Sequence, residues 1–517
     1  MEEWGGGYVT DIEYVDGFYV DQSPRWMTLT ATLNGVHAPD FSGRFAYCEL
    51  GCGRGVTSSI LAAVHPQGQF HAIDFHPAHI AFARDQALSA GLGNLAFHEL
   101  SFADLAGPAG DALPMFDAIT MHGVWSWVAP ELQDAIVAFI DKRLKPGGLV
   151  YVSYNALPGW SSIAPMQRLM RELASLAFAR SDVAAGRAAA MIRSLAEAKI
   201  LPDSTDASRK RILELAGKGH LAYLAHEYLN EHWRPVYHLD VARALGKAKL
   251  SLAGSTDLLR NFHNVTYSAE QRDLLAAVPS PELRETLRDF HDDVWFRRDV
   301  YVRGERRMPA SRREEILADL RLTLKKAPPE TFEITRPDGA SWQPEPLIFR
   351  PILAALAEGP CRVADLMALG EIPGVSAVEL VGVLVGSGLA TVFDRPSPEA
   401  VQASDRLNAL IDMRESPRTT RSTVIAAPAL GAAVSLSGLD LGLYEDLQKG
   451  GAPDAEDLAR RYAILCQEES ASFVLEGKPV EDPAEVHAAL VREYAERIDR
   501  VIPLWRMMGI VPNGPGG

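Results

Sequence analysis

The chain has 517 residues, 47% of them hydrophobic, which predicts large buried cores in more than one domain. Its formal net charge of −16 at pH 7 argues against nucleic acid as a main partner, because phosphate binding requires clustered Lys and Arg. The four cysteines suggest neither a zinc cluster nor a disulfide framework, and the N-terminus has no signal peptide, so we expect a cytoplasmic protein.

Residues 1–40 carry several aromatic residues, among them Tyr8 and Tyr19, ahead of an Ala/Leu-rich helix. One explanation is that aromatic anchors pack this N-terminal helix on a following sheet.

A glycine loop follows the first predicted strand. The segment Tyr-Cys-Glu-Leu-Gly-Cys-Gly-Arg-Gly at 47–55 places Gly51, Gly53 and Gly55 at alternate positions after Glu49, with Cys52 inside the loop. Glycines let the backbone turn sharply and approach a ligand closely. A carboxylate two residues ahead suits a ligand with a positive centre, so the pattern favours S-adenosylmethionine over a dinucleotide. An ordinary strand-to-helix turn is the alternative.

The next elements extend this unit. We expect a helix over 56–64 and a strand over 69–74, whose last residue, Asp74, is placed to meet ribose hydroxyls about 20 positions past the glycines. A helix over 77–90 and a strand over 95–100 follow. Ser101 and Phe102 at the end of that strand are expected to flank adenine, with Phe75 assigned to the same cofactor site.

Two further strands, at 116–121 and 149–154, are separated by a helix over 130–144 and a Lys-Pro-Gly-Gly turn. Five strand and helix cycles predict an α/β fold with a Rossmann-like, doubly wound parallel sheet, which binds ligands at the carboxyl ends of its strands. His122 stands at one of those ends.

These motifs together resemble class I S-adenosylmethionine-dependent methyltransferases. A narrower resemblance, to bacterial methyltransferases that carry a methyltransferase regulatory domain and include rickettsial protein lysine methyltransferases, rests on the segments 122–128, 153–160, 226–229 and 234–237. The resemblance implies S-adenosylmethionine as cofactor and S-adenosylhomocysteine as product. It also implies that the aromatic leader folds over the cofactor, which makes Tyr19 and Gln22 candidates for a lid.

Near the ends of the fourth and fifth strands, side chains are placed to line an acceptor channel, and three of these, His122, Trp125 and Tyr154, are our catalytic candidates. Trp and Tyr faces attract a lysine ammonium through cation–π interaction. His122 either accepts a proton or contacts the cofactor through its backbone. Packing at a domain interface is the alternative for the tryptophans. The full set is His122, Trp125, Trp127, Tyr154, Asn155 and Trp160.

Beyond the methyltransferase domain and its lid (1–160), we expect a helical insertion (161–217), a regulatory domain (218–305), a linker with a β-hairpin (306–345) and a winged-helix-like α+β domain (346–517). The insertion covers the active-site face or serves a homodimer. His226 and Glu227 are adjacent and diverge on a helix, so we expect no metal site. The uncharged stretch 422–439 is predicted to be buried core and not a membrane span.

The leading hypothesis is a methyltransferase that acts on lysine side chains of a protein. A small-molecule O- or N-methyltransferase is the first alternative, and a non-catalytic cofactor-binding regulatory protein is the second. Intact Glu49, Gly51, Gly53 and Asp74 argue against that second alternative.

Overall fold

The computed structural model describes residues 5–12, 17–326, 328–329, 331–335, 341–369, 375–410, 422–469, 473–475, 478–480 and 482–511. The chain divides into two compact units. Residues 1–58, 69–84 and 95–308 form the first, and residues 59–68, 85–94 and 309–517 form the second.

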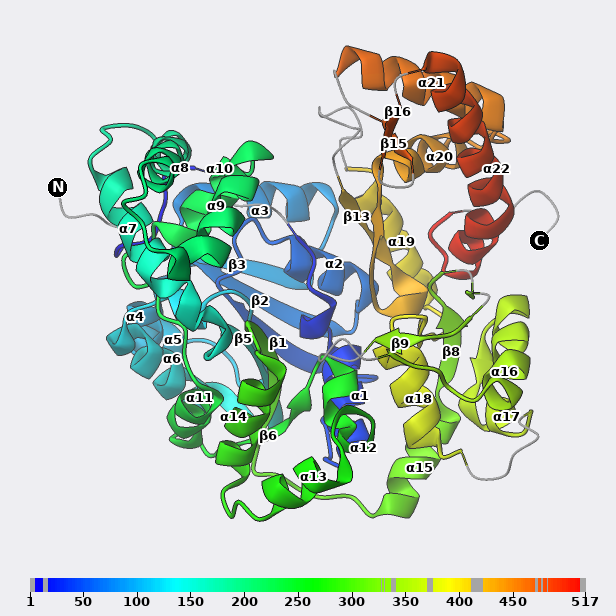
Figure 1. The fold of residues 1–517 in the computed structure, drawn as a ribbon. Coiled ribbons are helices and arrows are strands. Elements are labelled where there is room, and N and C mark those ends of the chain that lie inside the picture. The colour runs from blue at the N-terminus through cyan, green and yellow to red at the C-terminus, as the bar shows by residue number, and fades with distance from the viewer. Residues whose placement is uncertain are drawn as a thin grey trace. The chain divides into compact units, whose positions relative to one another are not determined.

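A seven-stranded sheet in the order β3-β2-β1-β4-β5-β7-β6 is the centre of the first unit (Figure 1). β2 pairs with β3, β1 with β4, and β4 with β5, all in parallel, which confirms the predicted doubly wound sheet. The strands are β1 (Phe45–Leu50), β2 (Gly68–Asp74), β3 (Leu95–Glu99), β4 (Phe116–Met121), β5 (Leu144–Asn155), β6 (Leu250–Ser255) and β7 (Phe296–Arg303).

Two strands of this sheet come from the segment that was expected to form a separate regulatory domain. β7 runs antiparallel to both β5 and β6, so residues 218–305 complete the methyltransferase sheet. Without β7, the edge of β5 would expose a row of unpaired backbone groups. The predicted bounds of the regulatory domain, 218–305, stay a prediction, and its strands β6 and β7 join the sheet of the methyltransferase domain.

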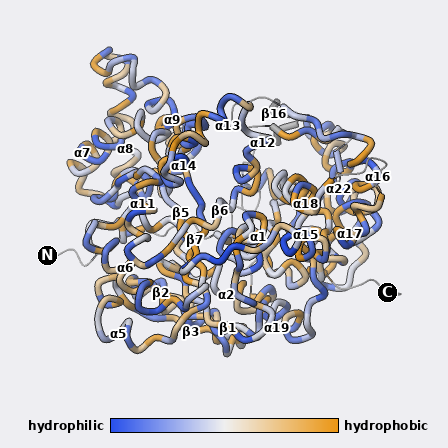
Figure 2. The backbone as a smooth tube through the Cα atoms, turned by 90° about the horizontal axis from the view of Figure 1, so that it is seen from below, coloured by the Kyte–Doolittle hydropathy of each residue, from blue (hydrophilic) through white to orange (hydrophobic). Residues whose placement is uncertain are grey.

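The helices between residues 24 and 292 include those predicted at 56–64, 77–90 and 130–144, and the first of these has the predicted bounds. Hydrophobic and hydrophilic residues alternate along helices such as α7 and α11, as expected for helices with one buried side (Figure 2). The helices between residues 24 and 292 are α1 (Pro24–Leu33), α2 (Val56–Val64), α3 (Pro77–Ser89), α4 (Phe102–Leu105), α5 (Pro108–Asp111), α6 (Pro130–Arg143), α7 (Ala164–Ser175), α8 (Ser181–Glu197), α9 (Asp206–Gly217), α10 (Leu221–Tyr228), α11 (His238–Gly246), α12 (His263–Thr266), α13 (Ala269–Ala276) and α14 (Pro281–Asp292).

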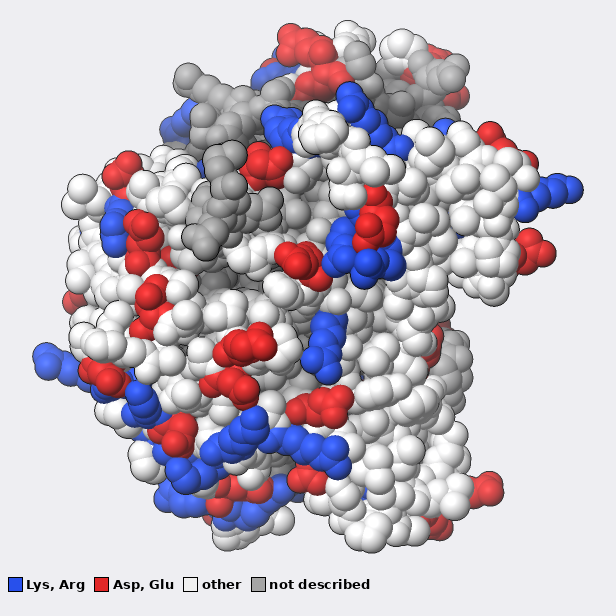
Figure 3. All heavy atoms as spheres, turned by 90° about the vertical axis from the view of Figure 1, so that its left-hand side faces the viewer, with Lys and Arg blue, Asp and Glu red and all other residues white. Residues whose placement is uncertain are grey.

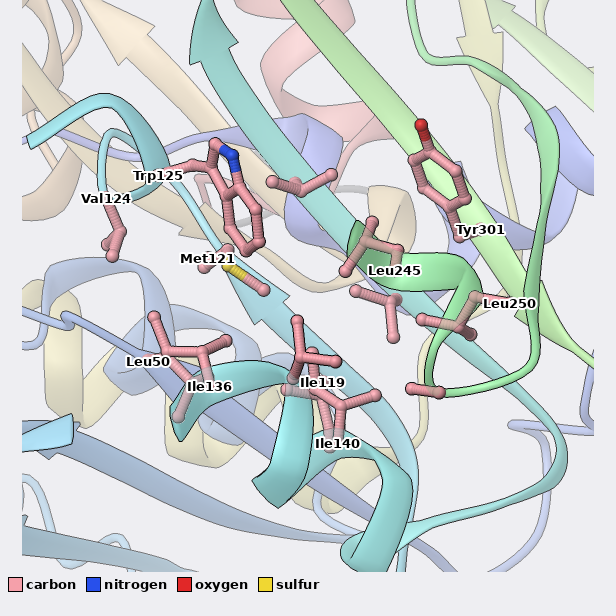
Figure 4. Close-up of a cluster of buried hydrophobic side chains, with 14 of the residues drawn as sticks. Leu50, Ile119, Met121, Val124, Trp125, Ile136, Ile140, Leu245, Leu250 and Tyr301 are labelled. Carbon is pink, nitrogen blue, oxygen red and sulfur yellow. The ribbon is translucent and has the colours of Figure 1, made fainter. Parts of the chain in front are cut away.

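The two faces of the sheet differ in chemistry. Leu50, Met121 and Val152 stand beside one another on β1, β4 and β5 and belong to a buried apolar cluster with side chains of α6 and α11 (Figure 4). Their strand neighbours point to the other face, because side chains alternate along a strand. Glu49, Thr120 and Tyr151 are aligned there.

The N-terminal segment covers that second, polar face. The Tyr47 hydroxyl donates to the Gln22 carbonyl over 3.1 Å. Asp21 accepts a hydrogen bond from the Thr256 hydroxyl over 2.6 Å and lies 3.4 Å from Arg298 of β7. The short 3-10 helix η1 (Val20–Gln22) is thus fastened to β1 and to the β6–β7 part of the sheet.

In the second unit, β8 (Arg321–Leu324) pairs antiparallel with β11 (Cys361–Arg362) and β12 (Ala390–Val392). The three predicted short helices are present as α16 (Pro346–Glu358), α17 (Val363–Met367) and α18 (Ala377–Gly386). The predicted hairpin is seen as β9 (Ile334–Thr335) paired with β10 (Ser341–Trp342), and its expected turn at 337–339 lies outside the described residues. The winged-helix assignment stays a prediction.

The second unit also contains α15 (Ala310–Asp319), which precedes β8, and α19 (Pro398–Asn408), which follows β12. The uncharged stretch at 422–439 forms a largely buried hairpin of β13 (Thr423–Ala427) and β14 (Ala432–Leu436), which confirms it as core. No helix in the described part of the chain has the length and apolarity to cross a membrane. The remaining elements are α20 (Gly438–Gln448), α21 (Ala455–Glu468), β15 (Phe473–Leu475), β16 (Lys478–Val480) and α22 (Pro483–Met507).

Candidate active site

A cavity of about 250 Å³ lies at the carboxyl ends of β1 to β4 in the first unit. Of the residues predicted to bind the cofactor, all but Gln22 and Gly55 line it. The lining residues are Gly5, Gly6, Tyr8, Gly17, Tyr19, Glu49, Gly51, Cys52, Gly53, Arg54, Val56, Thr57, Asp74, Phe75, His76, His79, Leu100, Ser101, Phe102, His122, Gly123, Val124, Trp127, Val128 and Leu132.

The glycine loop forms the floor of this cavity. Gly53 has a φ of +52°, and a Cβ atom at this position would meet no atom within 4 Å, so the loop leaves open space where a ligand can approach the backbone. A Cβ at Gly55 would instead come within 2.4 Å of the Phe97 ring. Gly55 therefore permits close packing against β3, which corrects its assignment as a cofactor contact.

Asp74 is held rigidly at the end of β2. Its Oδ2 accepts a hydrogen bond from the Gly53 amide and its Oδ1 accepts one from the His76 amide, both over 2.9 Å. The carboxylate is 8% exposed and borders the cavity. Each oxygen retains a lone pair, so Asp74 can also accept hydrogen bonds from two ribose hydroxyls.

Glu49 is a buried carboxylate, 4% exposed, that borders the same cavity. It accepts hydrogen bonds from Gln22 Nε2 over 3.1 Å and from the Ser58 hydroxyl, and among the described residues no Lys or Arg lies within ion-pair distance. Burial raises the pKa of Glu49 to about 7, although both hydrogen bonds act in the opposite direction. An ammonium group in the cavity would supply the countercharge, so the site fits the amino-acid part of S-adenosylmethionine.

Gln22 is fully buried and does not line the cavity. Its amide instead reaches Glu49, so the predicted cofactor contact is corrected to an indirect role: Gln22 orients the carboxylate.

Tyr19 closes over His122. The two rings are stacked with their centroids 3.5 Å apart, and His122 Nδ1 shares a 2.8 Å hydrogen bond with the Tyr151 hydroxyl. Burial, helped by the positive charge of Arg298, lowers the pKa of His122 to about 3. The imidazole is therefore neutral at physiological pH and a poor general base.

Trp125 does not line the cavity, contrary to the prediction that it borders an acceptor channel. It is 2% exposed and packs in the apolar cluster with Met121 and Ile136 (Figure 4). The 3-10 helix η2 (Trp125–Trp127) turns the two tryptophans apart, so that Trp127 borders the cavity.

The structure also contradicts the prediction that Tyr154 lines an acceptor channel. It is 1% exposed, and its hydroxyl donates to Asp299 Oδ2 over 2.8 Å and contacts His238. Tyr154 stands three residues after Tyr151, an odd spacing that puts the two side chains on opposite faces of β5. Only Tyr151 shares a face with Glu49. Neither Trp125 nor Tyr154 can touch a substrate in this arrangement.

Asn155 and Trp160 are buried as well. The Asn155 side chain donates to Glu227 Oε1 over 3.2 Å. Trp160 packs edge-on against Trp233 and Trp295. These contacts favour the alternative of interface packing for Trp160, and they leave His122 and Trp127 as the members of the predicted channel that reach the cavity.

Sequence reasoning missed Tyr8 as part of the site. Its ring lines the cavity and contacts the rings of Phe75 and His226, with centroids 6.2 and 5.8 Å away. The aromatic residues of the N-terminal segment were the signal that could have indicated Tyr8. Nothing local in the sequence, however, indicates that residues 5–12 lie between the end of β2 and α10. Val9 N donates to Asn230 Oδ1 over 2.9 Å, which holds this segment in place.

Acidic and basic side chains are intermixed on the face drawn in Figure 3, so that face offers no continuous basic surface for phosphates. Within the described ranges, no group of three or more His, Cys, Asp or Glu residues is arranged to hold a metal ion.

Two family models match the chain. A model described as "Methyltransferase domain" matches residues 48–150, and one described as "Predicted methyltransferase regulatory domain" matches residues 220–303. Together with the doubly wound sheet and the glycine-loop cavity, these matches define an S-adenosylmethionine-dependent methyltransferase.

An uncharacterized protein of Synechocystis sp. is 32% identical over 520 residues, which cover 98% of this chain and 99% of its own length. The chain therefore belongs to the class I methyltransferases that carry a methyltransferase regulatory domain. An uncharacterized protein of Rickettsia prowazekii is 31% identical over 160 residues, 31% of this chain and 28% of its own.

The fold is similar to that of PKMT2 from Rickettsia typhi in complex with AdoHcy. The TM-score is 0.67 at 19% identity, over 96% of this chain and 99% of that chain.

Proposed function

We propose that this methyltransferase transfers methyl groups to lysine side chains of a protein. The observation that carries the proposal is the wall of the cavity at the end of β4, where Tyr19, Trp127, Val128 and Leu132 gather. An aromatic and apolar wall suits the four-carbon stem of lysine and, through cation–π attraction, its methylated ammonium products.

The resemblance to the group that includes rickettsial protein lysine methyltransferases supports the proposal, and the likeness in fold to PKMT2 from Rickettsia typhi extends over nearly the whole chain. The helices and the second unit that follow the catalytic sheet would then present the polypeptide. A small metabolite would not need this additional structure.

The cofactor would lie along the strand ends. Ser101 and Phe102 would flank adenine, Asp74 would accept hydrogen bonds from the ribose, and Glu49 would meet the ammonium group. S-adenosylmethionine supplies, when bound, a methyl group already activated by a sulfonium. The protein therefore has to align the acceptor and exclude water.

The acceptor amine has to reach the cavity without its proton. His122 is neutral but too weakly basic to take a proton from a lysine ammonium, since its pKa lies near 3. We assign to the stacked His122 and Tyr19 rings the role of excluding water beside the reacting atoms, with no dedicated general base.

The test is incubation of the full-length enzyme with radiolabelled S-adenosylmethionine and a cell lysate, followed by separation by size and amino-acid analysis of labelled protein. Label in methyl-lysine is the expected result. The variant Gly53→Trp, whose side chain fills the open space of the loop, is the inactive control. Label that enters only the small-molecule fraction would refute the lysine assignment and favour a small-molecule acceptor.

We also propose a cytoplasmic location and a homodimer. The four cysteines are free thiols, which fits a reducing compartment. Size-exclusion chromatography with light scattering tests the dimer, and a monomer at micromolar concentration would contradict it.

A further inference from the structure

A second cavity, of about 470 Å³, lies in the second unit, and α22, the red helix of Figure 1, forms one of its walls. The α22 residues that line it follow the i, i+3, i+4, i+7 spacing of a single helix face, from Glu493 to Met508 at the end of the helix. At a rise of about 1.5 Å per residue, this face is about 22 Å long. The cavity is therefore a groove about as long as an extended peptide of about seven residues.

The strand β14 forms another wall of the groove. Its residues Ala433, Val434 and Ser435 all line the cavity. Since side chains alternate along a strand, three consecutive residues border one cavity where the edge of the strand is turned toward it. Among the described residues, β14 pairs with β13 alone, and the two strands form a sheet by themselves. The outer edge of β14 therefore presents backbone N–H and C=O groups to the groove.

The C-terminal half of the α22 face is apolar. Val501, Leu504 and Trp505 line the groove there, and Trp505 is 4% exposed. The Trp505 ring meets the Tyr444 ring edge-on, with the two centroids 6.2 Å apart, which holds it in place. This half of the groove can bury apolar side chains of a ligand.

The N-terminal half of the same face is charged, but its charges are balanced within the protein. Arg497 lies 2.7 Å from Asp440, and Arg500 lies 3.1 Å from Glu496 of the same helix. These two arginines have carboxylate partners already, so this half of the groove has little need of an outside ion.

Lys325 and Lys326 also line the groove, directly after β8. In the part of the chain that the structure describes, no carboxylate lies within ion-pair distance of either lysine. Two residues before Lys325, the Thr323 hydroxyl donates to Met507 Sδ over 2.9 Å, which brings the lysines to the apolar end of α22. The groove therefore combines an apolar wall, a strand edge and two uncompensated positive charges.

We propose that this groove binds an extended peptide segment of a partner protein, which adds a strand to β14 and places acidic side chains beside Lys325 and Lys326. Strand addition gains affinity from main-chain hydrogen bonds and specificity from alternate side chains. Apolar side chains at alternate positions would lie against α22, and two carboxylates would balance the lysines. A lipid or another small amphipathic anion would leave the strand edge unpaired. The proposal goes beyond the proposed function and does not depend on the methyl acceptor.

The probes that test this are the heptapeptide Asp-Asp-Val-Thr-Val-Thr-Val and its reverse sequence, which together cover both strand directions. Each has blocked ends and a fluorescein label and is titrated with the full-length enzyme by fluorescence anisotropy. We expect one of them to bind, and the double variant Lys325→Gln, Lys326→Gln to weaken that binding about tenfold or more. Asn in place of both Asp residues should weaken binding to wild type by a similar factor and have little further effect on the double variant.

N-methylation of alternate peptide amides separates strand pairing from simple filling of the groove. In a bound strand, one set of alternate N–H groups faces β14 and the other set faces away from it. Methylation of one set should therefore abolish binding, and methylation of the other should change the affinity less than about threefold.

Lys449→Gln is the matched control, because Lys449 is an exposed lysine of the second unit that does not line the groove. It should bind the peptide like wild type, and the affinity for S-adenosylhomocysteine should be unchanged in every variant. None of these measurements uses methyl transfer, so they are separate from the test of the proposed function.

Three results would overturn the proposal: no binding of either peptide, undiminished binding by the lysine double variant, or equal loss of affinity for both N-methylated peptides. Dodecanoate tests the other occupant. If it binds in a manner that depends on the two lysines while neither peptide binds, the groove is a site for a small amphipathic anion.

Discussion

Replacing Glu49 by Gln removes a buried negative charge and keeps the shape of the side chain. Burial raises the pKa of Glu49 from 4.5 to about 7, so the folded chain holds this proton about 3 kcal/mol more firmly than the unfolded chain does. Since the folded-state pKa is the higher one, this contribution to stability is complete below pH 4.5 and is lost as the pH rises to about 7. Apo Glu49→Gln should therefore lose less stability than wild type between pH 5 and pH 8.

The same substitution should weaken the binding of the cofactor. A hydrogen bond between charged groups contributes about 1.5–3 kcal/mol, so Glu49→Gln should weaken S-adenosylmethionine about 10- to 100-fold. An ammonium beside Glu49 also returns its pKa toward the ordinary value. Wild type should then release about half a proton on binding near pH 7, and the variant should release none from this group.

Isothermal titration in two buffers of different ionisation enthalpy measures both the affinity for S-adenosylmethionine and the number of protons released on binding. The matched ligand is 5′-methylthioadenosine, which has the adenosyl part but no ammonium, and its affinity should not distinguish wild type from Glu49→Gln. If both ligands weaken equally, or if the variant releases as many protons as wild type, Glu49 does not meet the ammonium and the reasoning fails.

Two other substitutions test the corrected placements. Trp125→Ala should lower the free energy of unfolding by about 3–5 kcal/mol in urea titrations, because Trp125 fills the apolar cluster, and a loss below about 1 kcal/mol would contradict its burial. His122→Phe keeps a ring against Tyr19, so the rate of label transfer at pH 8 should fall less than about tenfold, whereas loss of a general base reduces rates about 10²- to 10⁴-fold. A fall of more than a hundredfold would restore His122 as a base.

The cofactor half of the site was predictable because its signals are local. A strand, a glycine loop and a helix at 45–64 require only neighbouring residues, and Asp74 follows one repeat later. Gln22 and Gly55 are the exceptions within this half, and Gln22 is the one that local sequence could not place. Its role depends on the fold of the N-terminal segment over Glu49, and no spacing along the chain indicates that contact.

The acceptor half was predicted less well. Tyr154 was assigned by its position at a strand end, but the alternation along β5 already places it opposite Tyr151, so this error could have been avoided from the sequence. Trp125 and Trp127 are different. Both follow the same strand at even spacing, and only the turn of η2 decides which one packs in the core.

By itself, then, the sequence determined the parallel sheet, the glycine loop and the carboxylates at the ends of β1 and β2, because periodicity and short loops specify them locally. The tertiary structure decided that β6 and β7 complete the sheet, that the leader lies over Glu49 and that Tyr8 lines the cavity. Those contacts join residues up to 277 positions apart, as between Asp21 and Arg298, and pairing at such separation depends on packing of the whole first unit.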